Sequence, residues 1–322
     1  MMVDERFPVP APEVGVPRLS GAGYRVTALP YGTRIDAPEG GRLLYSRPDA
    51  QHHLTETVAP PEGHASAEVD LALVDVVEAP ETIGALRRAG VVGMTTAVVA
   101  IGGDHRVHSP AEFARRAKLW GALAPSDGQV LSCPPSTWPP PRVRGPHRML
   151  VTGGARSGKS AEAERRLLGE PDVTYLATGP KSDSDPAWAQ RVAAHRQRRP
   201  WWWRTEETLN VVGVLDAAEG AVLFDCVGTW LAGVMGECGL WEDPPPGGAA
   251  AEVAARIEEL VASWRQCTAR IVAVTNEVGS GVVPATASGG MFRDLLGRLN
   301  QRLAAESEEV VLTVAGRVTR LP

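Results

Sequence analysis

A glycine-rich segment at residues 153–160 constrains this chain more than any other feature. Its sequence is GGARSGKS, which fits G-x-x-x-x-G-K-[ST] at every fixed position. The apolar run Met149-Leu150-Val151 before it has the pattern of a strand, and 161–168 has that of a helix. This order predicts a phosphate-binding loop, because glycines let backbone N–H groups point at phosphate oxygens near a helix N-terminus. The alternative is a glycine-rich turn that only joins a strand to a helix.

The loop predicts nucleotide binding, with defined roles for two side chains. Lys159 is expected to reach the outer phosphates, and the Ser160 hydroxyl is expected to hold Mg²⁺. The chain has only three lysines, so one of them lies in this loop. The nucleotide-binding residues expected here are Gly153, Gly154, Ala155, Arg156, Ser157, Gly158, Lys159 and Ser160.

Composition excludes several classes of function. The net charge of −5 gives no basic field for nucleic acid. No apolar run approaches the roughly 18 residues of a membrane helix, and the acidic, proline-containing N-terminus does not resemble a signal peptide. The four cysteines are scattered, which is typical of a reducing compartment. We expect a cytoplasmic protein without membrane insertion.

The chain after residue 148 alternates between apolar runs and helical patterns. Continuous apolar runs are typical of a parallel sheet that is covered on both faces. We therefore predict a three-layer α/β domain of the P-loop NTPase type over 148–322. Its expected strands are 149–152, 173–177, 221–224, 271–275 and 310–314, and its expected helices are 161–168, 186–198, 251–265 and 291–306.

Residues 1–125 predict a smaller α/β domain, joined to the second by a proline-rich linker at 126–147. Strands are expected at 24–29, 42–46, 71–75 and 96–101, and helices at 81–89 and 109–119. The pairs Asp104-His105 and His52-His53 could be metal ligands. A dimetal centre needs more converging ligands, so surface or loop histidines are the alternative.

Two acidic residues follow strands of the expected second domain. Ligands of such sheets bind beyond the carboxyl ends of the strands. Asp225 could complete a Mg²⁺ site with Ser160, or it could be the N-cap of the next helix. Glu277 could orient a substrate or a metal-bound water, or it could belong to an ordinary turn.

His195 is the only histidine after His147, and arginines surround it in the sequence. Neighbouring positive charge favours a neutral imidazole, which could attack a nucleotide phosphorus to form a covalent phosphoramidate. The alternative is a solvent-facing histidine on a helix. The following Trp201-Trp202-Trp203 could stack on a planar ligand, or could pack a helix end onto the domain.

Six segments in order resemble the bifunctional adenosylcobinamide kinase/adenosylcobinamide-phosphate guanylyltransferase family of cobalamin assembly. The resemblance covers 148–322, and its most specific part is TNEVG with the later NQ. The segments are 153–160 (GGARSGKS), 191–200 (RVAAHRQRRP), 203–207 (WRTEE), 274–279 (VTNEVG), 292–294 (FRD) and 297–301 (GRLNQ).

The resemblance implies two reactions. ATP or GTP phosphorylates adenosylcobinamide, and GMP from GTP then passes through a histidine, which falls on His195, to adenosylcobinamide phosphate. The resemblance also implies a homotrimer. Residues 285–290 (ATASGG) depart from the family pattern, which usually has an acidic, polar stretch there. Alternatives are a small-molecule kinase or a nucleotide-dependent regulatory protein without the transfer step. Further implied nucleotide contacts are Thr178, Gly179, Pro180, Arg196, Gln197, Arg198, Arg199, Glu207 and Asp225.

Residues 20–125 more loosely resemble a truncated metallo-β-lactamase-like domain. The half that would bring the main metal histidines is missing. The resemblance implies a non-catalytic, metal-free domain that stabilises or positions its neighbour. Metallohydrolase activity in this part is the alternative.

Overall fold

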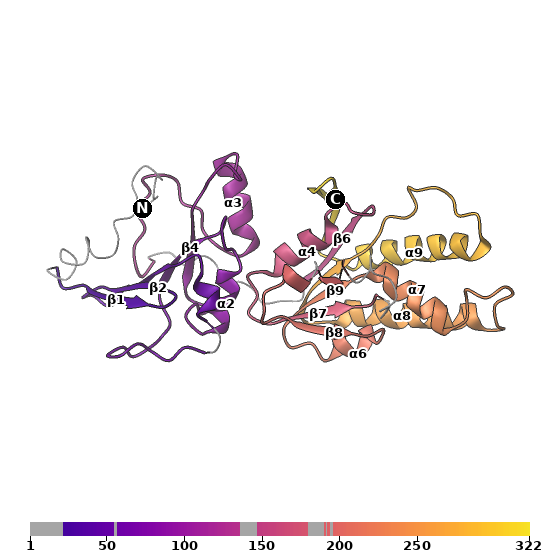
Figure 1. Ribbon diagram of the computed structural model, residues 1–322, viewed down its shortest axis with the longest axis horizontal. Coiled ribbons are helices and arrows are strands. Elements are labelled where there is room, and N and C mark those ends of the chain that lie inside the picture. Colours follow the sequence, from indigo (N-terminus) through magenta and orange to yellow (C-terminus); the bar gives the residue numbers. More distant parts are fainter. Residues whose placement is uncertain (1–21, 55–56, 136–146, 180–189, 191, 194–195) are drawn as a thin grey trace. The chain divides into compact units, whose positions relative to one another are not determined.

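The computed structural model describes residues 22–54, 57–135, 147–179, 190, 192–193 and 196–322. The chain forms two compact units, of which the second comprises 145–167 and 172–322 (Figure 1). Most of the expected linker, 136–146, lies outside the described residues. The linker at 126–147 and the kinship of 1–125 with metallohydrolases therefore stay predictions.

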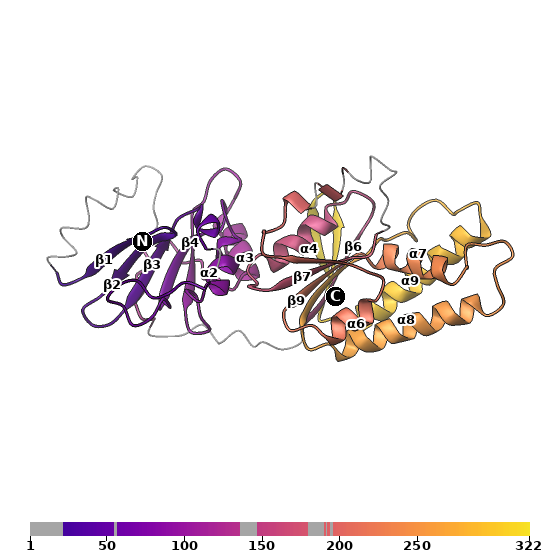
Figure 2. The same ribbon diagram turned by 60° about the horizontal axis from the view of Figure 1, so that its bottom comes forward.

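The first unit is built on a five-stranded sheet in the order β1-β2-β3-β4-β5. Strands β1 to β3 pair antiparallel, and β3 to β5 pair parallel (Figure 2). Each of the four expected strands forms, and β2 is an addition that the sequence did not predict. The strands are β1 (Arg25–Leu29), β2 (Gly32–Asp36), β3 (Arg42–Ser46), β4 (Leu71–Asp75) and β5 (Ala97–Ile101).

Both predicted helices of the first unit are confirmed as α2 (Thr82–Arg88) and α3 (Pro110–Leu119), and η1 (Ala50–His52) is a short 3₁₀ turn. Helix α3 begins after Ser109, whose hydroxyl accepts a hydrogen bond from the Glu112 backbone N–H at 3.2 Å. A serine N-cap followed by proline is the start signal that the sequence carried.

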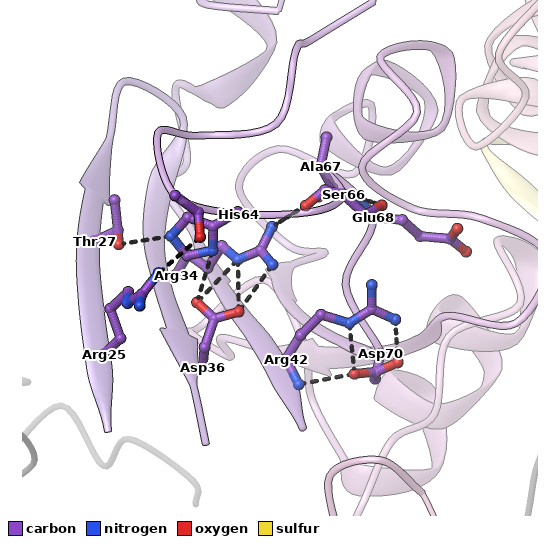
Figure 3. Close-up of polar contacts among 11 residues, drawn as sticks. Arg25, Thr27, Arg34, Asp36, Arg42, His64, Ser66, Ala67, Glu68 and Asp70 are labelled. Carbon is purple, nitrogen blue, oxygen red and sulfur yellow. Dashed lines mark hydrogen bonds and ion pairs between the residues drawn. The ribbon is translucent and has the colours of Figure 1, made fainter. Parts of the chain in front are cut away.

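A buried arginine organises the polar interior beside β2 (Figure 3). Arg34 is 2% exposed, and its Nε donates to both carboxylate oxygens of Asp36 at 3.0 and 3.1 Å. Its Nη1 donates to the Ser66 carbonyl at 2.7 Å, and His64 Nδ1 lies 3.4 Å from Asp36. One cation therefore joins β2 to the loop that contains His64, since buried charges need such partners.

The second unit contains a seven-stranded sheet in the order β12-β11-β6-β10-β9-β7-β8. All neighbouring strands pair parallel except β12, which runs antiparallel to β11. The five predicted strands all form. The strands are β6 (His147–Gly153), β7 (Val173–Ala177), β8 (Arg204–Glu207), β9 (Ala221–Asp225), β10 (Arg270–Val274), β11 (Glu309–Val314) and β12 (Arg317–Leu321).

Helices cover both faces of this sheet. Helix α4 packs against β6, β9, β10 and β11 on one face. On the other face, Phe224, Trp230 and Trp264 lie in a core shared by α7, α8 and α9. The predicted three-layer α/β architecture is confirmed. The helices are α4 (Lys159–Leu167), α6 (Val211–Asp216), α7 (Val227–Glu237), α8 (Ala249–Gln266) and α9 (Ala287–Ala305).

The sequence did not predict β8, β12, α6 or α7. Strand β8 lies at the sheet edge with all four residues exposed, so it shows no apolar alternation. Helix α7 contains Gly228, Gly233 and Gly236, which weaken a helical pattern. Across the described residues, none of the helices is long and apolar enough to span a membrane.

Candidate functional site

The glycine loop lies between the end of β6 and the start of α4, as the motif predicts. A Cβ atom on Gly153 would lie 2.6 Å from Ser157 Oγ and would also clash with the Thr313 carbonyl oxygen. Gly158 has a φ of +97°, a conformation that favours glycine. Glycine is therefore required at both positions, and the loop is a tightly turned segment at the carboxyl end of the central strand.

Lys159 extends back over the loop from the first turn of α4. It is 6% exposed, and its Nζ donates to the Gly154 carbonyl at 3.1 Å. The backbone of Arg156 is left-handed, with a φ of +57°. A buried ammonium group held above turned backbone is the arrangement in which a lysine contacts phosphate oxygens.

Two buried hydroxyls lie at the loop without using their hydrogen-bonding capacity. Ser157 Oγ and Thr313 Oγ1 have no hydrogen-bond partner within the described part of the chain. Thr313 lies against the loop. A Cβ atom built on Gly158 would be 3.7 Å from the Cγ2 atom of Thr313. Unpartnered buried hydroxyls are costly, and both of these lie next to the turned backbone of the loop.

Asp225 ends β9 and accepts a hydrogen bond from the Tyr175 hydroxyl at 2.5 Å. The pKa of Tyr175 is raised by its burial and then by the charge of Asp225, so the phenol stays protonated and donates. The N-cap of α7 is Cys226, whose Sγ accepts from the Thr229 N–H at 3.4 Å. The alternative in which Asp225 caps this helix is therefore wrong, because the cap lies one residue later.

Thr178 is 3% exposed, and its hydroxyl is engaged by the fold. The hydroxyl donates to the Cys226 carbonyl at 2.8 Å, and the Thr178 N–H donates to the Asp225 carbonyl at 3.2 Å. The residue thus fixes the junction of β7 with α7. Gly179 is half-buried, and Pro180 lies outside the described residues.

The arginines after residue 195 contact the elements around the glycine loop. Arg198 donates to the Glu164 carboxylate of α4 from Nε at 2.9 Å and from Nη2 at 3.2 Å. The Arg199 guanidinium carbon lies 3.1 Å from the centroid of the Tyr175 ring. His195 itself lies outside the described residues, but the chain directly after it is anchored to α4 and β7.

The charges of this cluster influence one another. Burial raises the pKa of Glu164, and the charge of Asp225 acts in the same direction, while Arg198 opposes both. Burial lowers the pKa of Arg199, and its Nε is buried without a hydrogen-bond partner in the described ranges. Two carboxylates and two guanidinium groups therefore share one partly desolvated region beside the glycine loop.

Arg196 and Glu207 pair with each other at the edge of this cluster. Arg196 Nη2 lies 2.6 Å from Glu207 Oε1, and the Arg196 side chain is 59% exposed. Gln197 is exposed as well. These three residues lie at the surface, where a ligand could exchange with their present contacts.

The cobinamide kinase / cobinamide phosphate guanyltransferase family model matches residues 149–321, which is more than half of the chain. The chain belongs to this family. The resemblance predicted from the six sequence segments is thereby confirmed.

Curated relatives match the same half of the chain. The bifunctional adenosylcobalamin biosynthesis proteins CobU of Salmonella typhimurium and Escherichia coli are each 41% identical to it over 175 residues. That match covers 52% of this chain and 96% of each relative. CobP of Pseudomonas aeruginosa is 38% identical, with 52% of this chain and 94% of that protein covered. Residues 1–148 lie outside the family match.

One family segment, 275–279, lies directly beside the glycine loop. The Glu277 N–H donates to the Gly153 carbonyl at 3.1 Å. Asn300 of α9 accepts from the Thr275 hydroxyl at 2.7 Å and donates to the Asn276 carbonyl at 3.1 Å. The segment that contains Glu277 is therefore held between the loop and α9, and the role of Glu277 in orienting a substrate stays a prediction.

The three tryptophans separate into two groups. Trp202 and Trp203 are buried, whereas Trp201 is 52% exposed and meets Trp202 edge-on at 5.7 Å between ring centroids. Packing thus accounts for Trp202 and Trp203. Stacking on a planar ligand is excluded for these two rings by their burial.

Sequence reasoning missed Tyr175 and Glu164 as members of the cluster. Tyr175 was only one residue of an apolar strand, and Glu164 resembled a solvated residue on a helix. The only sequence signal for Glu164 was its place in the second turn after the glycine loop, in a chain with arginines that could pair with it.

In the first unit, the Arg106 side chain donates hydrogen bonds to the Asp104 carboxylate. Hydrogen bonds from the Arg106 side chain and backbone lower the pKa of Asp104 to about 2. His53 Nε2 lies 3.6 Å from Asp49. Over the residues that the structure describes, no group of three or more His, Cys, Asp or Glu side chains is placed to hold a metal ion. Within those residues, neither Asp104-His105 nor His52-His53 therefore gains a third metal ligand.

Proposed function

We propose that the second unit carries out two successive reactions on adenosylcobinamide at one nucleotide site. The observation that carries this proposal is the Arg198–Glu164 ion pair, which ties the segment after His195 to the helix that follows the glycine loop. Membership of the cobinamide kinase / cobinamide phosphate guanyltransferase family and the names of the relatives support both reactions.

The first proposed reaction is phosphoryl transfer from ATP or GTP. The substrate hydroxyl oxygen attacks the γ-phosphorus, the bond to the β–γ bridging oxygen breaks, and the nucleoside diphosphate leaves with that electron pair. The hydroxyl proton passes to a carboxylate or to solvent. Lys159 and the turned backbone of 153–158 would stabilise the charge on the phosphoryl oxygens.

The second proposed reaction proceeds in two displacements. An imidazole nitrogen of His195 attacks the α-phosphorus of GTP, and pyrophosphate leaves. A phosphate oxygen of adenosylcobinamide phosphate then attacks the same phosphorus, the P–N bond breaks, and the imidazole is regenerated. Arg196, Arg198 and Arg199 would hold the phosphates, because guanidinium groups pair with phosphate in two-point geometry.

Magnesium fits the donor set that the site presents. Hard cations prefer oxygen ligands, and the Ser160 hydroxyl and the Asp225 carboxylate are such groups. When bound there, the ion would neutralise charge on the phosphate oxygens. Tyr175 would orient Asp225 through its 2.5 Å hydrogen bond. We also propose the homotrimer and the cytoplasmic location that the sequence led us to expect.

The proposal is tested by mass spectrometry of the intact protein after incubation with GTP. We expect one added GMP that is stable in base and labile in acid. The label should be lost in His195→Ala and retained in His147→Ala, the matched histidine of the same unit. GTP binding without any label on wild type would instead support a kinase or a regulatory protein.

A further inference from the structure

A cavity lies beside the glycine loop, between α9 and the strands β6, β11 and β12. Its volume is about 660 Å³, which is within the usual range for small-molecule sites. None of its lining residues belongs to the expected nucleotide contacts. Because it lies on the α9 side of the sheet, α4 does not form its wall.

The cavity is lined by groups of both charges. Arg293, Asp294 and Arg298 extend from α9, and Glu277 comes from the segment after β10. Arg293 Nη2 donates to the Gly279 carbonyl at 2.5 Å, which fixes one guanidinium in the wall. Arg298 is exposed, so its guanidinium is reachable by a ligand. Such a lining suits a ligand that combines a phosphate with hydroxyl or amide groups.

A buried hydroxyl at the sheet side of the cavity points to a polar ligand. Thr152 of β6 lines the cavity and is 7% exposed. Its Oγ1 is buried and has no hydrogen-bond partner among the residues described. An unpartnered buried hydroxyl destabilises a fold, and such a group is commonly retained where a ligand supplies the partner.

The cavity is connected to the phosphate site by backbone. Glu277, at one end of the cavity, donates its N–H to the Gly153 carbonyl at 3.1 Å. Thr152 directly precedes the loop glycine. A ligand in the cavity could therefore present a terminal oxygen to a nucleotide held by residues 153–160.

Building on the proposed function, we propose that this cavity binds the acceptor, that is, the arm of the corrinoid that carries first a hydroxyl and then a phosphate. Arg298 pairs with the arm's phosphate, and Thr152 and Asp294 hydrogen-bond its polar groups. The nucleotide enters from the α4 side of the loop and the acceptor from the α9 side. The two substrates then meet at the carboxyl end of β6.

Matched pairs of variants on α9 test this assignment. Arg298→Gln removes a cavity cation, whereas Arg302→Gln removes a cation of the same helix that pairs with Glu258 at 2.5 Å. Gly297→Leu fills the cavity and Gly290→Leu does not, although a Cβ on either glycine would meet nothing within 4 Å. Each variant is assayed for covalent GMP labelling without acceptor and for the KM of adenosylcobinamide phosphate.

We expect Arg298→Gln to raise the acceptor KM about tenfold or more, which is the effect of losing one charged contact. Gly297→Leu should raise the acceptor KM as well, because leucine occupies space in the cavity. Both should still be labelled by GTP, and Arg302→Gln and Gly290→Leu should match wild type. An unchanged acceptor KM in both cavity variants would overturn the assignment while leaving the proposed function intact. Wild type that accepts no GMP would instead remove the proposed function itself.

Thr152→Val gives a readout that a purely structural role would not produce. Valine has a similar shape and removes the unpartnered hydroxyl, so we expect a higher melting temperature together with a higher acceptor KM. A higher melting temperature with unchanged KM would contradict a ligand contact at Thr152.

Discussion

Arg198 makes a two-point ion pair with Glu164, at 2.9 Å from Nε and 3.2 Å from Nη2. Glu164 is 4% exposed and lies on α4, five residues after Lys159. Arg198 follows His195 by three residues. The pair therefore joins the helix that begins at the phosphate loop to the segment that contains the proposed nucleophile.

Replacing Glu164 by glutamine should slow the formation of the GMP-protein adduct. Glutamine keeps the shape but removes the charge that Arg198 pairs with at 2.9 and 3.2 Å, so the anchor of the chain after His195 is weakened. We expect roughly a tenfold lower labelling rate at saturating GTP, since misplacement of a reacting group has effects of this order or larger. Quenched-flow labelling with radioactive GTP measures that rate.

The matched control is Glu259→Gln, an exposed glutamate of α8. Its labelling rate should equal that of wild type. A Glu164→Gln variant with unchanged labelling rate would show that the ion pair does not position the segment.

Tyr175→Phe should weaken the response to Mg²⁺. The variant removes the 2.5 Å hydrogen bond to Asp225 without changing the packing of the ring. We expect a loss of about 1 kcal/mol of stability, as for other single hydrogen bonds, and a higher Mg²⁺ concentration for half-maximal phosphoryl transfer. Magnesium titration of kinase activity measures the second effect, and unaltered Mg²⁺ dependence would argue against Asp225 as a ligand.

Much of the second unit was predictable from sequence, because its central strands are buried on both faces. Strands such as β9 and β10 are continuous apolar runs, and the glycine motif predicts the turn between β6 and α4. The edge strand β8 was not predictable, since all four of its residues are exposed and only its pairing with β7 makes it a strand. Local pattern thus identifies buried strands better than edges.

The contacts of the site were less predictable than its residue types. Tyr175 and Asp225 are 50 residues apart in sequence, and they meet because β7 and β9 pair in a register that aligns Ala177 with Asp225. Arg198 and Glu164 likewise meet across separate elements. In the first unit, β2 was missed because its buried residues are Gly32 and Arg34, and neither gives the apolar alternation that marks a strand.

Lys159→Ala should weaken both reactions. Its Nζ lies over the glycine loop, and losing one desolvated charged contact typically costs roughly 2 kcal/mol or more, or about 30-fold in rate. We expect losses of this size in both phosphoryl transfer and GMP labelling, measured separately. Lys118→Ala on α3 is the control, and it should behave as wild type. A variant that loses only one activity would contradict a shared site.

Asp36→Asn should destabilise the first unit. Arg34 is 2% exposed, and its buried charge would lose the carboxylate that it pairs with at 2.8 Å. Removing one partner of a buried pair costs about 3 kcal/mol or more. Hydrogen exchange of the β2 amides measures the effect within this unit. Asp49→Asn breaks the exposed pair with Arg47 and should change protection little.

Glu308 should make the second unit sensitive to acid. Hydrogen bonds from Arg148 lower the pKa of Glu308 from 4.5 to about 2. A carboxyl group whose pKa is lower in the folded state stabilises the fold above its unfolded pKa, and this contribution is lost as the pH falls toward the folded value. The stability difference between wild type and Glu308→Gln should therefore be largest at neutral pH and should shrink as the pH falls from about 4.5 toward about 2. Urea unfolding at a series of pH values measures that difference, and a difference that stays constant across this range would show that the Arg148 contact is absent in solution.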